Sequence, residues 1–234
     1  MESVCTPRRP SSLNRAISPP SSKIGILTSQ NSSFAPFALG FKEDLRKRGY
    51  GAEIFNNHEE ISSDYDVIFV LSYFRKIPAD ALRRHPHNLV VHASDLPCGR
   101  GWAPFFWQIL EGKSKIPIVL FEATEELDAG PIYLKDAIVL EGHELHDELR
   151  SLQAHKCIEL CLRFLSENPK PIPQSGEPSF YRRRTRDDSE LDIDKPLKEL
   201  FNNLRIASND NYPAFFRICD HKYVVRIFKD ERSR

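Results

Sequence analysis

The chain has 234 residues, and its 33 Lys and Arg residues are balanced by 33 Asp and Glu residues, so the formal net charge is zero. This balance gives no overall attraction to nucleic acid or to an anionic membrane. No apolar run reaches the roughly 18 residues that a transmembrane helix needs. The five cysteines form no CxxC motif, so neither a disulfide framework nor a zinc site is indicated, and a reducing compartment fits them best. We therefore expect a cytoplasmic protein without metal, membrane or nucleic-acid partners.

The first 22 residues are rich in Ser, Pro and Arg and contain no apolar segment of the secretory kind, so they predict a disordered tail. An organellar transit peptide is the alternative for this stretch. Regular structure is expected from Lys23 onward, where KIGILTS is typical of a buried parallel strand that enters a loop.

Short apolar runs alternate with helical patterns over residues 23–168, which we expect to form the catalytic domain. Further strands are predicted at residues 52–55, 66–72, 88–94, 116–122 and 131–140, and helices at residues 34–48, 78–85, 103–111 and 144–167. This order predicts an α/β fold with a Rossmann-like, mostly parallel sheet and helices on both faces. Ligands of such sheets gather at the carboxyl ends of the strands, here at Ser72–Pro78, His92–Trp102 and Glu125–Gly130.

The composition changes at Asn168, because NPKPIPQSGEP holds too much Pro and Gly for a helix or a strand. Residues 169–234 are expected to form this linker and a small annex. KPLKELFNNLRIAS predicts one helix, and AFFRI with KYVVRIF predicts a terminal β-hairpin. Exposed aromatic residues in that hairpin are compatible with a homodimer.

Three polar residues suggest acyl-type transfer. Asn88 and His92 are four apart on one strand, so their side chains share a face and are expected to project together at the carboxyl end. There Asn88 can donate to an oxyanion and His92 can accept a proton from an attacking amine, while Asp128 can orient the imidazole from an adjacent turn. Each residue alone is ordinary, since a single strand histidine is usually structural.

NLVVHASDLPCGRGWAPFFWQILEG, followed by FEATEELDAGPIY, resembles the signature of the formyltransferase family. The resemblance spans roughly residues 23–165. It implies that Asn88, His92 and Asp128 transfer a formyl group from 10-formyltetrahydrofolate to an amine, without a metal. It also implies that the pteridine binds beside two segments, with contacts from Lys76, Ile77, Pro78, Leu127, Asp128 and Gly130.

The acceptor amine is indicated by the segment from Ser179 to Val225, which is similar to sugar-nucleotide N-formyltransferases, most closely to the PseJ-like enzymes of pseudaminic acid biosynthesis. This implies a UDP-linked 4-amino-4,6-dideoxy sugar as substrate, with Arg205 on the pyrophosphate and Tyr212 or Phe216 beside the base. The glycine-bearing loop adds further expected contacts to sugar or phosphate, from Ser94, Arg100, Gly101 and Trp102.

Several alternatives stay open. Other members of the family act on methionyl-tRNA or glycinamide ribonucleotide. The fold could also serve as a catalytically silent folate-binding scaffold or as a hydrolase in which water replaces the amine. Within the annex, Arg205 could instead be a solvated helix residue, with Tyr212 and Phe216 forming the hairpin core.

Overall fold

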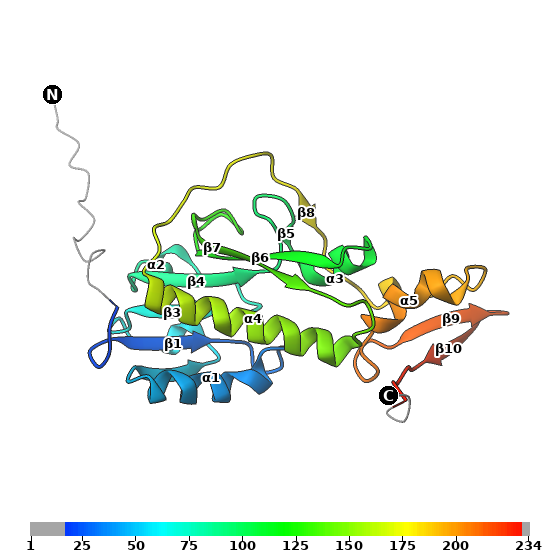
Figure 1. The fold of residues 1–234 in the computed structure, drawn as a ribbon, viewed down its shortest axis with the longest axis horizontal. Coiled ribbons are helices and arrows are strands. Elements are labelled where there is room, and N and C mark those ends of the chain that lie inside the picture. Colours follow the sequence, from blue (N-terminus) through cyan, green and yellow to red (C-terminus); the bar gives the residue numbers. More distant parts are fainter. Residues whose placement is uncertain (1–16, 231–234) are drawn as a thin grey trace.

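A six-stranded sheet forms the centre of the computed structural model, which describes residues 17–230 (Figure 1). Its strands lie in the order β2-β1-β3-β4-β6-β7. Their bounds are β1 Lys23–Leu27, β2 Gly51–Phe55, β3 Val67–Val70, β4 His87–His92, β6 Lys115–Glu122 and β7 Ile132–Val139. The first four are parallel, whereas β6 pairs antiparallel with β4, and β7 with β6. The expected Rossmann-like, mostly parallel sheet is confirmed. The antiparallel strands β6 and β7 at one edge were not predicted.

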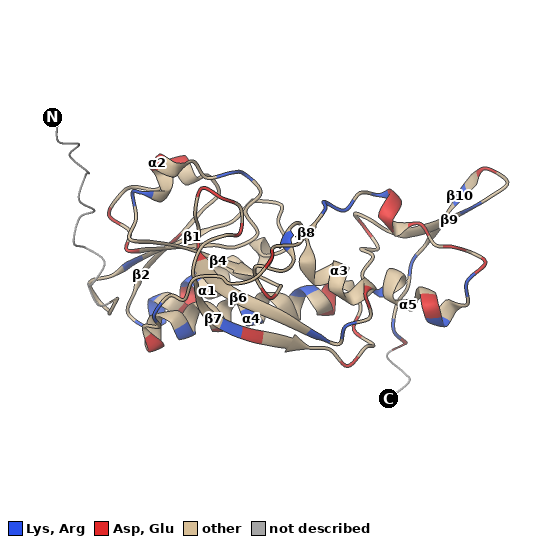
Figure 2. Ribbon diagram, turned by 90° about the horizontal axis from the view of Figure 1, so that it is seen from above, with Lys and Arg blue, Asp and Glu red and all other residues tan. Residues whose placement is uncertain are grey.

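The long helices α1 (Ala35–Lys47) and α4 (His146–Glu167) cover one face of the sheet, where α3 (Pro104–Leu110) joins the same core. Strand residues alternate between the two faces: Phe69 belongs to this core, while Ile68 and Val70 join a smaller cluster on the other side. Among the described residues, that second face carries the short helices α2 (Ala79–Leu82) and η2 (His58–Glu60) and loops, and Figure 2 shows α2 on the opposite side from α1 and α4.

The annex follows an irregular connector. Its first element, β8 (Phe180–Tyr181), pairs with β5 (Arg100–Gly101) of the main unit. The helix η3 (Asp187–Ser189) and helix α5 (Leu197–Arg205) precede the hairpin of β9 (Ala214–Ile218) and β10 (His221–Val225). The predicted helix and hairpin are therefore present, and they share a small core of Leu191, Leu204, Ala207 and Ala214.

The expected tail falls largely on residues 1–16, which lie outside the described residues. Residues 17–22 do make contacts, because Ile17 packs against the main core and Ser22 is buried beside the start of β1. Within residues 17–230, no helix is both long enough and apolar enough to cross a bilayer.

Candidate active site

His92 ends β4 at the carboxyl edge of the sheet and faces a carbonyl and a carboxylate. Its Nε2 lies 2.8 Å from the Gly99 carbonyl oxygen and 3.9 Å from Oδ2 of Asp128. A carbonyl only accepts, so Nε2 carries the hydrogen, and Nδ1 is then the unprotonated nitrogen of the neutral ring. The two side chains are 9% and 10% exposed, which strengthens any charge interaction between them. The structure thus brings together His92 and Asp128.

The turn that carries Asp128 is fixed from three sides. Asp128 has a φ of 51°, and its Oδ2 accepts a 2.8 Å hydrogen bond from the backbone N–H of Gly101. Nε2 of Gln174 donates to the carbonyl oxygens of both Asp128 and Gly130, each at 2.8 Å. A Cβ on Gly130 would lie 1.7 Å from the Glu122 carbonyl oxygen, so the turn requires glycine there.

Arg100 and Gly101 connect the His92 loop to the annex. A Cβ on Gly101, whose φ is +98°, would lie 2.4 Å from the Tyr181 carbonyl oxygen, so glycine permits the β5–β8 pairing. Arg100 is buried, and it donates to Oε1 of Glu126 at 2.6 Å and to Oε1 of Gln174 at 3.2 Å. Its guanidinium therefore holds the Asp128 turn and the connector together.

Asn88 does not stand beside His92, and the expectation that both project from the carboxyl end is wrong. Asn88 is the second residue of β4 and His92 is the last. Four residues of strand separate them by about 13 Å, because a strand rises about 3.3 Å per residue. The Asn88 amide donates to the Leu82 carbonyl at 2.8 Å, and its residue is 4% exposed. The four-residue spacing correctly predicts that Asn88 and His92 share a face of β4, but it does not show that they lie at opposite ends of the strand.

A cavity of about 520 Å³ lies beside the end of β3, within the usual size range of small-ligand pockets. It is lined by His58, Glu59, Arg75, Lys76, Ile77, Pro78, Ala79 and Glu125. Three predicted cofactor contacts, Lys76 to Pro78, therefore line one cavity with Glu125 from the segment that carries Asp128. Burial and the nearby Arg75 lower the pKa of His58 below its usual value, so its ring is neutral at pH 7.

Ser94 and Trp102 belong to the same loop as His92. The hydroxyl of Ser94 is buried and has no hydrogen-bond partner among the described residues. Trp102 is 39% exposed, with the Arg183 guanidinium 4.9 Å from its ring centroid. The buried hydroxyl of Ser94 therefore still has a hydrogen bond to donate, and the exposed part of the Trp102 side chain can contact a ligand.

The annex residues differ among themselves. Tyr212 is 53% exposed, whereas Phe216 stacks on Tyr223 in the hairpin at 5.4 Å between centroids. Arg205 is only 3% exposed: Nη1 lies 3.0 Å from Oε2 of Glu144, and Nε donates to Oδ1 of Asn202 at 2.8 Å. Arg205 is thus neither solvated nor open, and binding a pyrophosphate would require this ion pair to separate.

Sequence reasoning missed Gln174 because it lies in a Pro-rich connector that carries no structural signal of its own. Within residues 17–230, no group of three or more His, Cys, Asp or Glu side chains is arranged to hold a metal ion.

A model of the formyl transferase family matches residues 16–160. The methionyl-tRNA formyltransferase of Listeria monocytogenes serotype 4a (strain HCC23) is 27% identical over 225 residues, which is 94% of this chain and 68% of that protein. Among solved structures, the methionyl-tRNA formyltransferase from Clostridium thermocellum has a TM-score of 0.75 at 22% identity and covers 91% of this chain and 95% of its own.

Two other solved structures share the fold. A likely sugar N-formyltransferase from Mycobacterium tuberculosis has a TM-score of 0.68 at 18% identity and covers 91% of this chain and all of its own. HypX from Aquifex aeolicus, solved with tetrahydrofolic acid, also has a TM-score of 0.68 at 18% identity, over 88% of this chain and 38% of its own. Because the family model matches more than half of the chain, the protein belongs to the formyl transferase family, whose formyl donor is 10-formyltetrahydrofolate.

Proposed function

We propose that this protein transfers the formyl group to the amine of a nucleotide-linked amino sugar, a UDP-linked 4-amino-4,6-dideoxy-N-acetylhexosamine. The observation that carries the proposal is the His92 and Asp128 pair at the carboxyl edge of the sheet, 3.9 Å apart and largely buried. 10-Formyltetrahydrofolate supplies the activated formyl carbon. The cavity formed by Lys76, Ile77 and Pro78 is the place that we assign to its pteridine.

His92 acts as the base. An amine that attacks a formyl carbon must lose a proton, and Nδ1 of His92 is free to accept it because Nε2 is held by the Gly99 carbonyl. The ring then becomes positively charged, and the Asp128 carboxylate stabilises that charge from 3.9 Å. His92 returns the proton to the folate nitrogen as the bond between that nitrogen and the formyl carbon breaks, so the products are the formylated amine and tetrahydrofolate. Asp128 keeps this position through its bond from the Gly101 N–H.

The negative charge on the formyl oxygen needs a donor, and Asn88 is at the wrong end of β4 to provide one. Ser94 is two residues beyond His92, and its buried hydroxyl has no partner among the described residues. We assign the donor role to Ser94. Loss of one such donor typically lowers turnover by about 10²–10³-fold, so Ser94→Ala tests the assignment, with Ser62→Ala, on an exposed turn, as the matched control.

The amino-sugar acceptor is supported by the zero net charge, by the exposed aromatic side chains of Trp102 and Tyr212, and by the likeness of the annex to sugar-nucleotide enzymes. The structure of a likely sugar N-formyltransferase is matched over its whole length. A second candidate acceptor, methionyl-tRNA, is favoured by the Listeria relative. The free thiols Cys98 and Cys219 fit a cytoplasmic location, and a homodimer through the hairpin stays a prediction.

The deciding experiment incubates the full chain with 10-formyltetrahydrofolate and either UDP- and dTDP-linked 4-amino-4,6-dideoxy sugars or methionyl-tRNA, and measures product mass. One added formyl group on a sugar nucleotide, lost in His92→Ala, supports the proposal. Formylation of the tRNA alone, with a rate that falls steeply as salt rises, would transfer the proposal to the second candidate. Folate binding without any product would indicate a silent scaffold, and formate release without an acceptor would indicate a hydrolase.

A further inference from the structure

Two arginines from distant parts of the chain converge on one aromatic ring. Arg150, on α4, has its guanidinium carbon 4.1 Å from the centroid of the Phe106 ring, and Arg184, which follows β8, lies 5.9 Å from the same centroid. Burial, together with the charge of Arg184, lowers the pKa of Arg150 to about 10. Two positive charges therefore share a poorly hydrated site.

Neither arginine forms an ion pair within residues 17–230. Arg150 donates to the neutral Oε1 of Gln153 at 3.1 Å, and Arg184 donates to the backbone carbonyl of Asp188 at 3.4 Å. The Nε atoms of both are buried and have no hydrogen-bond partner among the described residues. Guanidinium groups taken out of water normally require a carboxylate or another anion.

Arg100 and Arg205, which are more deeply buried than the half-buried Arg150 and Arg184, each have a carboxylate partner. Arg100 has Glu126 at 2.6 Å, and Arg205 has Glu144 at 3.0 Å. The exception at Arg150 and Arg184 is therefore local, and it is not a general property of the packing.

The titratable groups around the two arginines do not neutralise them. The carboxylate of Asp188 forms its hydrogen bonds with Arg182 and Thr185. Its charge attracts Arg184, but burial outweighs this attraction and lowers the pKa of Arg184 below its usual value. Asp147 is fully exposed and contacts His146 at 2.8 Å. Burial, in addition to the charges of Arg150 and Arg184, lowers the pKa of His146, so this histidine is neutral at pH 7 and adds no charge of either sign.

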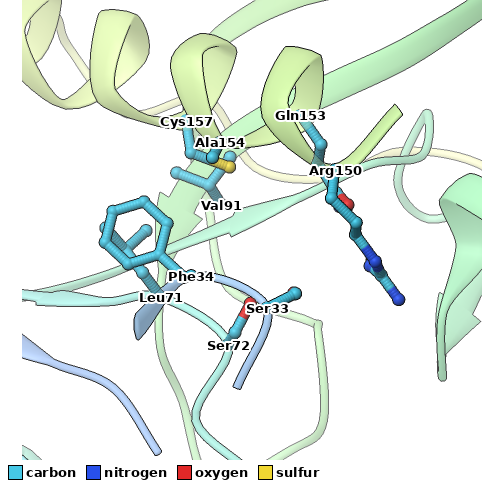
Figure 3. Close-up of a pocket in the computed structure, with 9 residues that line it drawn as sticks. All are labelled: Ser33, Phe34, Leu71, Ser72, Val91, Arg150, Gln153, Ala154 and Cys157. Carbon is cyan, nitrogen blue, oxygen red and sulfur yellow. The ribbon is translucent and has the colours of Figure 1, made fainter. Parts of the chain in front are cut away.

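Arg150 also borders a small cavity beside the catalytic strand. The cavity, of about 30 Å³, is lined by Ser33 and Phe34 before and at the start of α1, Leu71 and Ser72 at the end of β3, Val91 of β4, and Arg150, Gln153, Ala154 and Cys157 of α4. Figure 3 shows Arg150 extending from α4 at the edge of the cavity, with Ser33 and Ser72 on the loops below the helix. Val91 immediately precedes His92 on β4, so the two side chains face opposite sides of the sheet, and this polar pocket lies near the carboxyl end of β4 on the face that α1 and α4 cover. Its enclosed part holds little more than one water molecule, so a larger anion would occupy its open side.

We propose that Arg150 and Arg184 form a binding site for the phosphate groups of the acceptor, with Ser33 and Ser72 as further donors. Two guanidinium forks match the oxygens of a diphosphate, and the hydroxyls can satisfy the remaining ones. This inference rests on the proposed function, because it takes the diphosphate to be that of the nucleotide sugar. The diphosphate would then bind to Arg150 and Arg184, which have no carboxylate partner among the described residues, and not to Arg205, which is paired with Glu144.

The test is calorimetric titration of the full chain with inorganic pyrophosphate, which needs neither folate nor turnover. Wild type is compared with Arg150→Met and Arg184→Met, which keep an apolar contact on Phe106, and with Arg48→Met as control, since Arg48 is exposed and pairs with Asp44. We expect the dissociation constant for pyrophosphate to rise at least tenfold in the two site variants and to stay unchanged in the control. We also expect Arg150→Met to melt no lower than wild type without pyrophosphate, because it removes an uncompensated charge.

Equal pyrophosphate binding by all four proteins would overturn the site. A lower melting temperature of Arg150→Met, together with unchanged binding, would assign a purely structural role to Arg150. The two proposals can fail separately. Pyrophosphate binding that depends on both arginines, without formylation of any sugar nucleotide, would retain the site and reject the acceptor. Formylation of a sugar nucleotide with an unchanged KM in both variants would retain the acceptor and reject the phosphate site.

Discussion

Replacing Arg205 with Met should destabilise the protein without weakening substrate binding. Arg205 and Glu144 form an ion pair at 3.0 Å with residues that are only 3% and 6% exposed. Removing one member of a buried pair costs about 3–5 kcal/mol, because the remaining charge stays buried. Backbone N–H groups of Glu141 and Gly142 also bind the Glu144 carboxylate, at 2.6 and 2.9 Å, so the lower limit of about 3 kcal/mol applies. For a chain of this size, that corresponds to a melting temperature lower by about 6–12 °C.

The pH dependence of this loss has a definite sign. Burial alone would raise the pKa of Glu144, but the backbone N–H groups and Arg205 outweigh it and lower the pKa below its usual value. The stabilisation is therefore complete above the unfolded pKa of about 4.3 and is lost as the pH falls through the lower folded value. The difference in melting temperature between wild type and Arg205→Met should thus narrow below about pH 4.

Thermal unfolding from pH 3 to pH 8, with the KM for the acceptor measured at 25 °C, checks both statements. Glu144→Gln is the partner variant, since it removes the same ion pair from the other side. If Arg205→Met melted within 2 °C of wild type while the acceptor KM rose tenfold, the structural account would be refuted and Arg205 would be a pyrophosphate ligand.

The remaining predictions concern the site and the core. His92→Ala should lower kcat/KM by about 10²–10⁴-fold and also lose about 1 kcal/mol of stability, because the Gly99 carbonyl loses its donor. Asn88→Ala should keep its turnover and lose a similar amount of stability, because the Leu82 carbonyl loses its donor. Comparable losses of kcat/KM in the two folded variants would restore Asn88 to the chemistry. Gly101→Ala should lower both activity and stability, the latter by about 1–3 kcal/mol, because a Cβ there meets the Tyr181 carbonyl and shifts the N–H that holds Asp128; wild-type kcat/KM and melting temperature would contradict this. Burial raises the pKa of the Cys157 thiol to about 12, so iodoacetamide at pH 8 should modify Cys98 and leave Cys157 intact until urea unfolds the chain. Peptide mass spectrometry reads this out, and rapid native modification of Cys157 would show that the core opens.

Much of the fold follows from the sequence because buried strands appear as apolar runs. The runs at residues 66–72 and 88–94 correspond to β3 and β4, and the carboxyl-end rule brought His92 and Asp128 together from separate segments. The sequence does not reveal that β6 and β7 run antiparallel to their neighbours, since side chains alternate between the two faces of a strand whatever its direction.

The errors at single residues have physical causes of the same kind. The spacing of Asn88 and His92 fixes a common face, but only the strand bounds show that they lie at opposite ends. Likewise, the helical pattern around Arg205 contains no sign of Glu144, which lies far away in the sequence and meets it only through tertiary packing. Local sequence patterns predict which way a side chain points, but they do not predict which distant residue it contacts.

The two hydrogen bonds from Gln174 have a consequence for how such proteins diverge. Gln174 lies beyond residues 16–160, the part that the family model matches, yet it holds the turn that aims Asp128. The Asp128 carboxylate, to which we assign a catalytic role, therefore takes part of its position from a segment outside the region that the family model matches. Exchanging the connector between relatives would therefore change the position of Asp128, even if every residue of the loop that follows His92 were kept.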